Sequence, residues 1–262
     1  ERQSRKVVEL YKNVTDSIRY AKRLQESILP PDKRIKELLP RSFVYYKPKD
    51  IVSGDFYWFE RMEERVLFAA VDCTGHGVPG AFMSLVGYNG LNQAVKELGR
   101  SKPSEILHEL NRIAYGALHK DREQALVRDG MDMALCSYDP ARQVLEYAGA
   151  NCPLYVVREG EVLQFAPDKN AIGSFDLDGR SFTDHRIRLQ SGDMVYVFSD
   201  GYADQFGGPK GKKFLYRRFR ELLVEISTLP TDDQRDRINS AFNTWRGAHE
   251  QVDDILVIGI RA

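Results

Sequence analysis

The chain has 262 residues, and its composition of 42% hydrophobic and 29% charged residues is ordinary for a globular protein with one large domain or two small ones. Lys and Arg together number 38, and Asp and Glu also number 38, so overall charge excludes a general attraction to nucleic acid or to an anionic membrane surface. The apolar runs fall short of the roughly 18 residues of a membrane-spanning helix, so we expect no membrane segment in this sequence.

The first predicted element is a helix over residues 7–28. Apolar or small residues recur there at heptad spacing, which predicts a helix of about three repeats. These residues are Val7, Leu10, Val14, Ser17, Ala21, Leu24 and Ile28. Two interpretations stay open, a signalling helix that dimerises or an amphipathic helix packed on its own domain. The chain begins inside this pattern without Met, so we expect an upstream sensor domain on the same chain.

The remaining residues alternate between groups of strands and groups of helices. We predict a linker helix over residues 1–31, which Pro30-Pro31 ends, and one domain over 40–262. Strands are predicted over 43–46, 51–59, 65–71, 133–138, 144–148, 154–157, 162–165, 185–189, 194–199 and 255–260, and helices over 80–98, 103–120, 214–227 and 232–245. Short turns between strands indicate antiparallel pairing. The grouping favours an α+β fold, an antiparallel β-sandwich flanked by helices.

Four acidic sites stand at the ends or bends of predicted strands. Asp72 and Asp200 each follow a strongly apolar run, and a glycine lies close behind each of them. Asp253 and Asp254 come directly before the last strand, and Asp55 follows a glycine at a bend in an earlier one. A single Asp-Gly pair at a strand end is more often a turn than a ligand. Four such sites are harder to explain as turns alone.

These acids predict a site for divalent cations. If the fold brings the carboxylates together, their repulsion raises their pKa values unless a cation neutralises them. An all-oxygen ligand set selects magnesium, manganese or calcium over zinc or copper. Two such ions side by side activate water for in-line attack on a phosphoryl group.

Six motifs in order carry a resemblance to a known family. They are Ser53-Gly54-Asp55-Phe56, Asp72 with Gly75-His76-Gly77-Val78-Pro79-Gly80-Ala81, Asp129-Gly130-Met131-Asp132, Ala148-Gly149-Ala150-Asn151, Ser199-Asp200-Gly201 and Asp253-Asp254. They resemble the motifs of the stage II sporulation protein E-type phosphatases, the bacterial branch of the metal-dependent type 2C serine/threonine phosphatases. The resemblance covers residues 40–262, and the preceding helix is similar to the linker found behind sensor modules in this family.

The resemblance implies a type 2C phosphatase-like β-sandwich with two Mn²⁺ or Mg²⁺ ions at one end. By motif matching, Asp72 bridges both ions, and Asp200 and Asp253 are the other carboxylate ligands. The backbone carbonyl of Cys73 completes the ligands of one ion. With Asp55, these three aspartates are the expected catalytic residues.

The same resemblance implies the reaction. Metal-bound hydroxide attacks phosphoserine or phosphothreonine directly, without a phosphoenzyme intermediate. Asp55 is expected to hold metal-bound water, and Asp254 and His76 are expected around the ligands. The family's substrates include phosphorylated anti-anti-sigma factors, small proteins that control transcription by partner switching.

Two positions depart from patterns in the wider family. Animal type 2C enzymes carry a His two residues after the metal-binding Asp, whereas His76 lies four residues after Asp72. We therefore expect a structural role for His76 rather than general acid catalysis. Ala150 stands where the bacterial branch often has His, and we expect Asn151 to cap or turn the chain.

A basic loop and three cysteines complete the candidates. Lys210, Lys212 and Lys213 lie in a glycine-rich loop after the Asp200 motif, where they are candidates for contacting an anionic substrate; a solvated loop is the simpler explanation. The cysteines, Cys73, Cys136 and Cys152, form no C-x-x-C pair, which favours a reducing, cytoplasmic compartment. Cys73 lacks an evident base partner and fits a metal-binding turn better than a nucleophile.

The leading hypothesis is a protein phosphatase that acts on a signalling phosphoprotein. Its activity is set by the upstream sensor through the N-terminal helix, which we also expect to form a homodimer. Two alternatives stay open, a catalytically weak metal-binding scaffold and a hydrolase of small phosphoesters or nucleotides. The sequence has no G-x-x-x-x-G-K-[ST] motif for nucleotide binding, and we expect no nucleic-acid partner.

Overall fold

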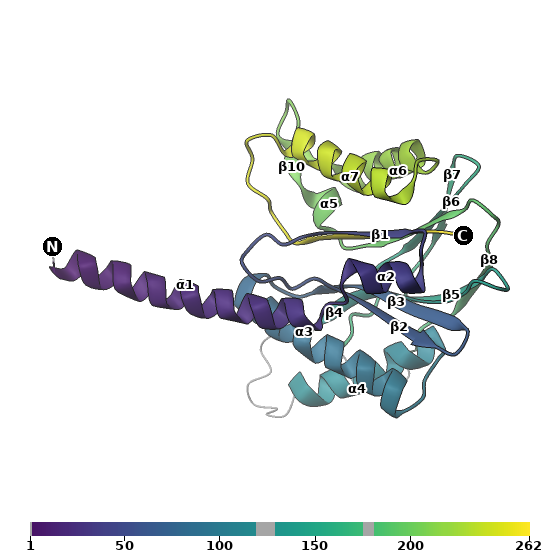
Figure 1. Cartoon of the computed structure of the whole chain (residues 1–262), viewed down its shortest axis with the longest axis horizontal. Coiled ribbons are helices and arrows are strands. Elements are labelled where there is room, and N and C mark those ends of the chain that lie inside the picture. The colour runs from purple at the N-terminus through teal and green to yellow at the C-terminus, as the bar shows by residue number, and fades with distance from the viewer. Residues whose placement is uncertain (1, 119–128, 175–180) are drawn as a thin grey trace.

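The computed structural model describes residues 2–118, 129–174 and 181–262. Two antiparallel five-stranded sheets lie face to face, and helices cover the outer face of each, giving four layers (Figure 1). The predicted α+β sandwich with an N-terminal helix is confirmed. Within the described ranges, no helix is both long enough and apolar enough to cross a bilayer.

The N-terminal part consists of two helices. Helix α1 (Arg2–Ile28) projects from the body of the molecule (Figure 1), and α2 (Asp32–Leu38) follows the two prolines. The sequence analysis missed α2, because seven residues are too few for a clear helical period. Ile35 and Leu38 of α2 are buried in the core between the sheets.

Both sheets are antiparallel throughout. In the first sheet the strand order is β1 (Ser42–Lys47), β12 (Ile255–Arg261), β9 (Met194–Phe198), β6 (Leu154–Arg158) and β7 (Glu161–Phe165). In the second it is β2 (Phe56–Met62), β3 (Arg65–Cys73), β4 (Met131–Asp139), β5 (Val144–Ala150) and β8 (His185–Arg188). The prediction of a strand over 51–59 is wrong in its first half, because residues 51–55 form a bend before β2.

Side chains alternate between two cores along each central strand. On β3, Leu67 and Val71 belong to the core beneath the helices, whereas Phe68 and Ala70 belong to the core between the sheets. A strand with both faces buried has no polar face, which explains why this segment is almost continuously apolar.

The helices form the two outer layers (Figure 1). The second sheet is covered by α3 (Gly77–Asn92), which continues as a π-helical segment (Gln93–Glu97), and by α4 (Pro103–Leu118). The first is covered by α6 (Leu215–Ile226) and α7 (Thr231–Arg246). The predicted helix over 103–120 is confirmed to Leu118, and its last two residues lie outside the described ranges. One-turn helix α5 (Gly201–Asp204) and the hairpin β10 (Phe206–Gly207) with β11 (Lys212–Lys213) were not predicted.

The strand directions gather the predicted acidic sites at one end of the sandwich. The end of β3 meets the starts of β2 and β4, since Val71 pairs with Phe56 and Cys73 with Met131. In the other sheet, the end of β9 meets the start of β12, where Phe198 pairs with Val257. The loops and strand ends that carry the acids therefore share one edge.

Candidate active site

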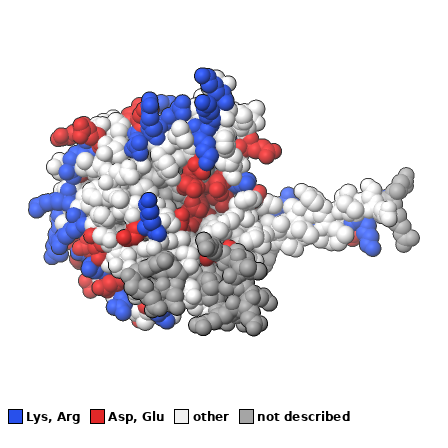
Figure 2. Space-filling model, turned by 180° about the vertical axis from the view of Figure 1, so that it is seen from behind, with Lys and Arg blue, Asp and Glu red and all other residues white. Residues whose placement is uncertain are grey.

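The structure brings the four predicted acidic sites together. Asp55 and Asp72 come from the second sheet, and Asp200 and Asp253 come from the first. The backbone N–H of Asp200 donates a hydrogen bond to the Asp72 carboxylate, which joins the two sheets at this point. Seen from behind, acidic side chains gather in a patch near the base of the projecting helix, with Lys and Arg side chains above it (Figure 2).

Glycines allow the turn after Asp72 to press against its neighbours. A Cβ atom on Gly54 would lie 2.5 Å from the carbonyl oxygen of Gly75, and a Cβ on Gly80 would overlap the same oxygen. Side chains at these positions would force the Asp72 turn away from the loop that carries Asp55. This close approach explains the glycines of both motifs.

A second close contact, between Gly201 and the backbone of Asp254, brings Asp200 near Asp253. A Cβ on Gly201 would overlap the carbonyl oxygen of Asp254. The backbone N–H of Leu256 also donates to Ser199 Oγ at 2.9 Å. The end of β9 is thereby fixed against the start of β12.

Asp254 holds the loop that carries Asp55. Its Oδ1 accepts a hydrogen bond from the backbone N–H of Lys49 at 2.7 Å, and its Oδ2 accepts one from Gly54 at 2.8 Å. The residue is 3% exposed. Since both oxygens already serve backbone groups, Asp254 fits the expected place around the ligands.

Asp55 is a buried carboxylate with an incomplete set of partners. It is 2% exposed, and its contact with the Ser199 hydroxyl favours the ionised form. Its Oδ2 has no hydrogen-bond partner among the described residues. Burial, followed by the charge of Asp72, raises the pKa of Asp55 well above its usual range. A buried carboxylate oxygen of this kind is costly unless a cation binds it.

The other acids repel one another in the same way. Burial, followed by the charges of Asp200 and Asp253, raises the pKa of Asp72 well above its usual range. Burial and then Asp253 raise the pKa of Asp200 to about 6, although Lys213 acts against this shift. Asp200 is exposed overall, so water screens part of this repulsion. Burial likewise raises the pKa of Asp253.

The sequence analysis quoted Asp132 and Ser199 as parts of motifs but gave neither of them a role in the site. Asp132 pairs with Asp72 across β3 and β4, and its Oδ1 accepts a 2.7 Å hydrogen bond from Nδ2 of Asn151. The predicted strand began at residue 133, two residues after the start of β4, and so left Asp132 outside it. Ser199 was predicted as the last residue of a strand, and only the structure shows its contact with the Asp55 carboxyl.

His76 lies in a chain of polar contacts beside the acids. Its Nδ1 is 2.6 Å from Oδ2 of Asp50, and its Nε2 is 3.2 Å from Nζ of Lys49. The charges of Lys49 and His76 both act to lower the pKa of Asp253. His76 therefore acts on the Asp253 carboxylate through its charge, while its direct contacts are to Asp50 and Lys49.

The predicted lysines lie on the hairpin after α5. Nζ of Lys213 is 2.8 Å from Oδ2 of Asp204. Lys210 and Lys212 are exposed. The hairpin therefore places positive charge near Asp200 without neutralising it.

The residues present fit divalent cations by their chemistry. Within residues 2–118, 129–174 and 181–262, no three His, Cys, Asp or Glu side chains form a ready-made metal-binding group. The fit rests on the partnerless oxygen of Asp55 and on the repulsion among the acids. Burial raises the pKa of the Cys73 thiol well above its usual range, so this thiol stays neutral and is no nucleophile.

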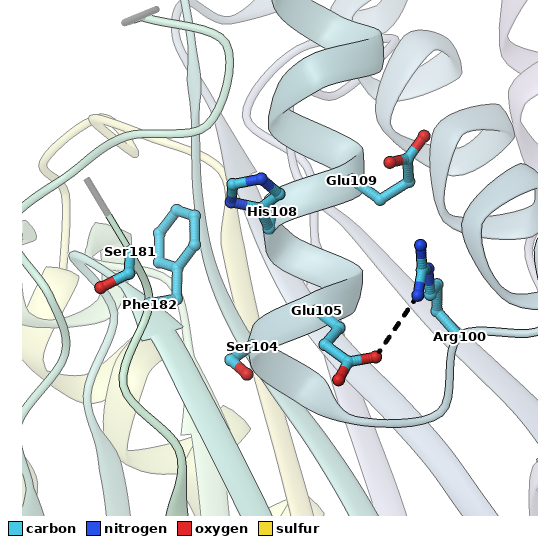
Figure 3. A pocket seen from close by; sticks show the side chains of 7 residues that line it. All are labelled: Arg100, Ser104, Glu105, His108, Glu109, Ser181 and Phe182. Atoms are coloured by element: carbon cyan, nitrogen blue, oxygen red, sulfur yellow. Dashed lines mark ion pairs between the residues drawn. The ribbon is translucent and has the colours of Figure 1, made fainter. Parts of the chain in front are cut away.

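A separate pocket of about 330 Å³ lies between α4 and residues 181–182. Figure 3 shows its lining, with Arg100 and Glu105 paired at 3.8 Å and His108 opposite Phe182. It contains none of the clustered aspartates, and its charges are mixed. We therefore place the chemistry at the acidic cluster.

Comparison with known proteins identifies the family and the fold of this chain. The family model of Stage II sporulation protein E (SpoIIE) matches residues 62–262. The solved SiaA-PP2C domain of Pseudomonas aeruginosa has a TM-score of 0.86 and 31% identity, covering 97% of this chain and 98% of that chain. A structure of the SpoIIE phosphatase domain with a regulatory fragment from Bacillus subtilis has a TM-score of 0.67 and 17% identity, covering 84% of this chain and 61% of that one, a likeness of fold.

A curated relative is also similar. Phosphoserine phosphatase RsbU of Bacillus subtilis (strain 168) is 25% identical over 200 residues, which are 74% of this chain and 56% of RsbU. This chain thus spans little more than half of that relative. From the matched model and the SiaA domain together, the chain belongs to the stage II sporulation protein E family, whose fold is that of the type 2C (PP2C) protein phosphatases.

Proposed function

We propose that this chain is a metal-dependent serine/threonine protein phosphatase that hydrolyses phosphoserine or phosphothreonine on a signalling protein. The observation that carries the proposal is the cluster of Asp55, Asp72, Asp200 and Asp253, whose pKa values are all raised by burial and by neighbouring acids. Bound divalent cations would remove this repulsion.

In this proposal Asp72, Asp200 and Asp253 hold two Mn²⁺ or Mg²⁺ ions, and the Cys73 carbonyl adds a further oxygen. Such cations, when bound, polarise phosphoryl oxygens and make water a nucleophile at neutral pH. The partnerless Oδ2 of Asp55 supports the fit, since it is an acceptor without a donor.

The chain's own residues keep these acids in position. Ser199 contacts the Asp55 carboxyl, and the amide of Asn151 fixes one oxygen of Asp132. Asp254 holds the loop before Asp55 through two backbone amides. The result is a set of carboxylates whose orientation is fixed before any substrate arrives.

We infer that the substrate is a phosphorylated protein, with anti-anti-sigma factors as the candidate class. RsbU, the curated relative, is a phosphoserine phosphatase, which supports phosphoserine as the substrate group. Lys210, Lys212 and Lys213 would contact the anionic surface of that protein, and the first two are exposed. An ammonium group attracts phosphate as a point charge.

The test is manganese-dependent hydrolysis of p-nitrophenyl phosphate by the chain, Asp72→Asn and Asp200→Asn, with circular dichroism to confirm folding. Each variant should lose about a thousandfold in turnover, because a ligand of the ions is lost. Asp236→Asn is the matched control, since that side chain is 78% exposed on α7 and should leave turnover unchanged.

Two outcomes would favour the alternatives. A folded parent chain that turns over nothing at any manganese concentration would indicate a scaffold. Turnover of free phosphoesters but of no phosphoserine protein or peptide would indicate a small-phosphoester hydrolase.

We further propose that α1 controls the site through Gln25. This side chain is 5% exposed, and its Nε2 donates to the Ser53 carbonyl at 2.6 Å and to Ser84 Oγ at 2.9 Å. Its Oε1 accepts from the backbone N–H of Ser53 at 3.0 Å. Ser53 is two residues before Asp55, so movement of α1 would move the catalytic loop.

The outer part of α1 supports the proposed dimer. Val7, Leu10, Val14 and Leu24 are between 50% and 65% exposed. A second copy of the helix would cover this apolar seam. An upstream sensor domain on the same chain would then act by changing how the two helices pair.

Gln25→Met tests the regulatory contact, and Gln3→Met, at an exposed position of the same helix, is its control. We expect Gln25→Met alone to raise the manganese concentration for half-maximal activity by about tenfold. Equal behaviour of the two variants would contradict this role. In sedimentation, Leu10→Glu should abolish any dimer of the parent chain.

A further inference from the structure

Exposed apolar side chains lie on the segment that follows the Asp200 motif. Outside α1, the exposed large apolar residues in the described ranges are Val78, Phe82, Leu98, Phe206, Leu215 and Tyr216. Phe206, Leu215 and Tyr216, which we call the apolar rim, all belong to the segment that runs from α5 into α6. Their exposed fractions are 41%, 52% and 38%. Where exposed apolar side chains form a contiguous patch, the patch marks a binding surface, and these three side chains come from one short segment.

The segment is fixed close to Asp200. Phe206 pairs with Lys213 in the hairpin, and the backbone N–H of Phe214 donates to the Gln205 carbonyl at 2.9 Å. The ring of Tyr216 lies 6.3 Å from that of Phe198, two residues before Asp200. These contacts hold both ends of the segment against the rest of the domain.

The backbone of Leu215 adopts a conformation that is unfavourable for a leucine. Its φ is 71°, in the left-handed region that non-glycine residues with bulky side chains avoid. The side chain is half exposed, so burial in the core does not account for this conformation. Backbone strain of this kind concentrates at functional sites.

The rim also lies among positive charges. Nζ of Lys213 is 5.9 Å from the centre of the Phe206 ring, and Lys210 and Lys212 are exposed on the same hairpin. A ligand that fits here combines an anionic group with apolar side chains. A small phosphoester would use the acids and cations without reaching the rim.

We propose that the apolar rim binds the polypeptide next to the phosphoserine and selects substrates with apolar residues flanking that position. The inference rests on the proposed phosphatase function and adds the sequence class of its substrate. Apolar residues of the substrate pack on Phe206 and Leu215 while the phosphate enters the acidic cluster. Burying one or two leucine-sized side chains favours such a substrate by about tenfold or more.

The test uses two synthetic phosphoserine peptides of equal length and charge, one with Leu on both sides of the phosphoserine and one with Ser there. The parent chain should show a kcat/KM about tenfold higher for the Leu peptide. In Phe206→Thr/Leu215→Asn this ratio should fall below about twofold. Threonine suits the short strand, and asparagine tolerates the left-handed backbone of residue 215, so both changes keep the local structure.

Leu98→Asn is the matched control. Leu98 is 46% exposed and lies at the other end of α3 and its π-helical extension, about 30 Å along the helix from the Asp72 turn. This variant should keep the parent's tenfold ratio. Hydrolysis of p-nitrophenyl phosphate by each variant confirms that the acidic cluster is intact.

Four results would overturn the inference. A parent that hydrolyses both peptides equally, or a double variant that keeps the preference, removes the role of the rim and leaves the phosphatase function standing. Loss of the preference in Leu98→Asn as well would show that the effect is not local. If the parent hydrolyses neither peptide nor p-nitrophenyl phosphate, the proposed function fails, and this inference fails with it.

Discussion

Asp193 and Asp55 are almost equally buried, at 3% and 2% exposure, but their surroundings are opposite. The Asp193 carboxylate accepts hydrogen bonds from Nε and Nη2 of Arg158 at 2.6 to 3.1 Å and from the backbone N–H of Gln190 at 2.8 Å. Asp55 has other acids as its charged neighbours and an oxygen without a partner. The first carboxylate is neutralised within the chain, whereas the second faces other acids, and we infer that a cation from solution would neutralise it. This difference separates an acid that stabilises the fold from one that we propose belongs to the active site.

The largest expected effect comes from breaking the buried ion pair between Arg158 and Asp193. Arg158→Met leaves Asp193 buried without a cation, and we expect the free energy of unfolding to fall by about 3 kcal/mol. Arg142→Met is the control, because Arg142 also faces a buried acid, Asp139, but is itself 75% exposed. Its loss should stay below about 1 kcal/mol. Urea denaturation measures both, and equal losses would contradict the comparison.

Replacement of Asp by Asn should change the free energy of unfolding in opposite directions at Asp55 and at Asp193. In metal-free protein Asp55→Asn removes a buried charge that the chain does not neutralise, so we expect stability at pH 7 to rise by about 1 kcal/mol. Asp193→Asn should instead destabilise, since it leaves Arg158 unpaired. Thermal unfolding in a chelator compares the two. A loss of stability in Asp55→Asn as large as that in Asp193→Asn would refute the distinction.

The pH dependence of stability provides a third comparison. The folded-state pKa of Asp200 is about 6, against an ordinary value of 3.8, so the folded chain binds this proton more tightly than the unfolded chain. Its contribution to stability is therefore complete below pH 3.8 and is lost as the pH rises through 6. Without metal, the unfolding temperature of the parent should fall relative to Asp200→Asn between pH 4 and 7.

Manganese should reverse this trend, because it binds the ionised acids and hence the folded state. Asp236→Asn, at an exposed position, should follow the parent at every pH. If the difference between the parent and Asp200→Asn stays constant across this range, the acids do not repel one another as the structure indicates.

The architecture was predictable because its signals are local. Continuous apolar runs mark strands with two buried faces, and the glycines beside Asp55, Asp72 and Asp200 mark places where backbones approach closely. Each of these features appears in a window of a few residues. The α+β sandwich and the gathering of four acidic sites at one edge follow from them.

The missed parts depend on contacts between distant residues. Gln25 looks like one more polar residue of an exposed helix, and only the fold shows that it contacts Ser53 and Ser84. Asp254 was expected around the ligands, but only the fold shows that its oxygens hold the Asp55 loop. No pattern within one segment carries that information, because the partners come from other elements.

The smallest expected effect concerns Lys213, whose charge acts on Asp200. Lys213 opposes the rise in the pKa of Asp200 and pairs with Asp204 at 2.8 Å, but its side chain is 42% exposed, so its influence is screened. At pH 8, where Asp200 is ionised, Lys213→Met removes a charge that repels an incoming divalent cation and frees the carboxylate of Asp204. Manganese should then bind about two- to threefold more tightly in calorimetric titration. Lys212→Met, on the same hairpin, should leave the affinity unchanged. Weaker binding in Lys213→Met would mean that this lysine organises the acids, as Arg158 does for Asp193, and that the site is less dependent on external cations than its charges suggest.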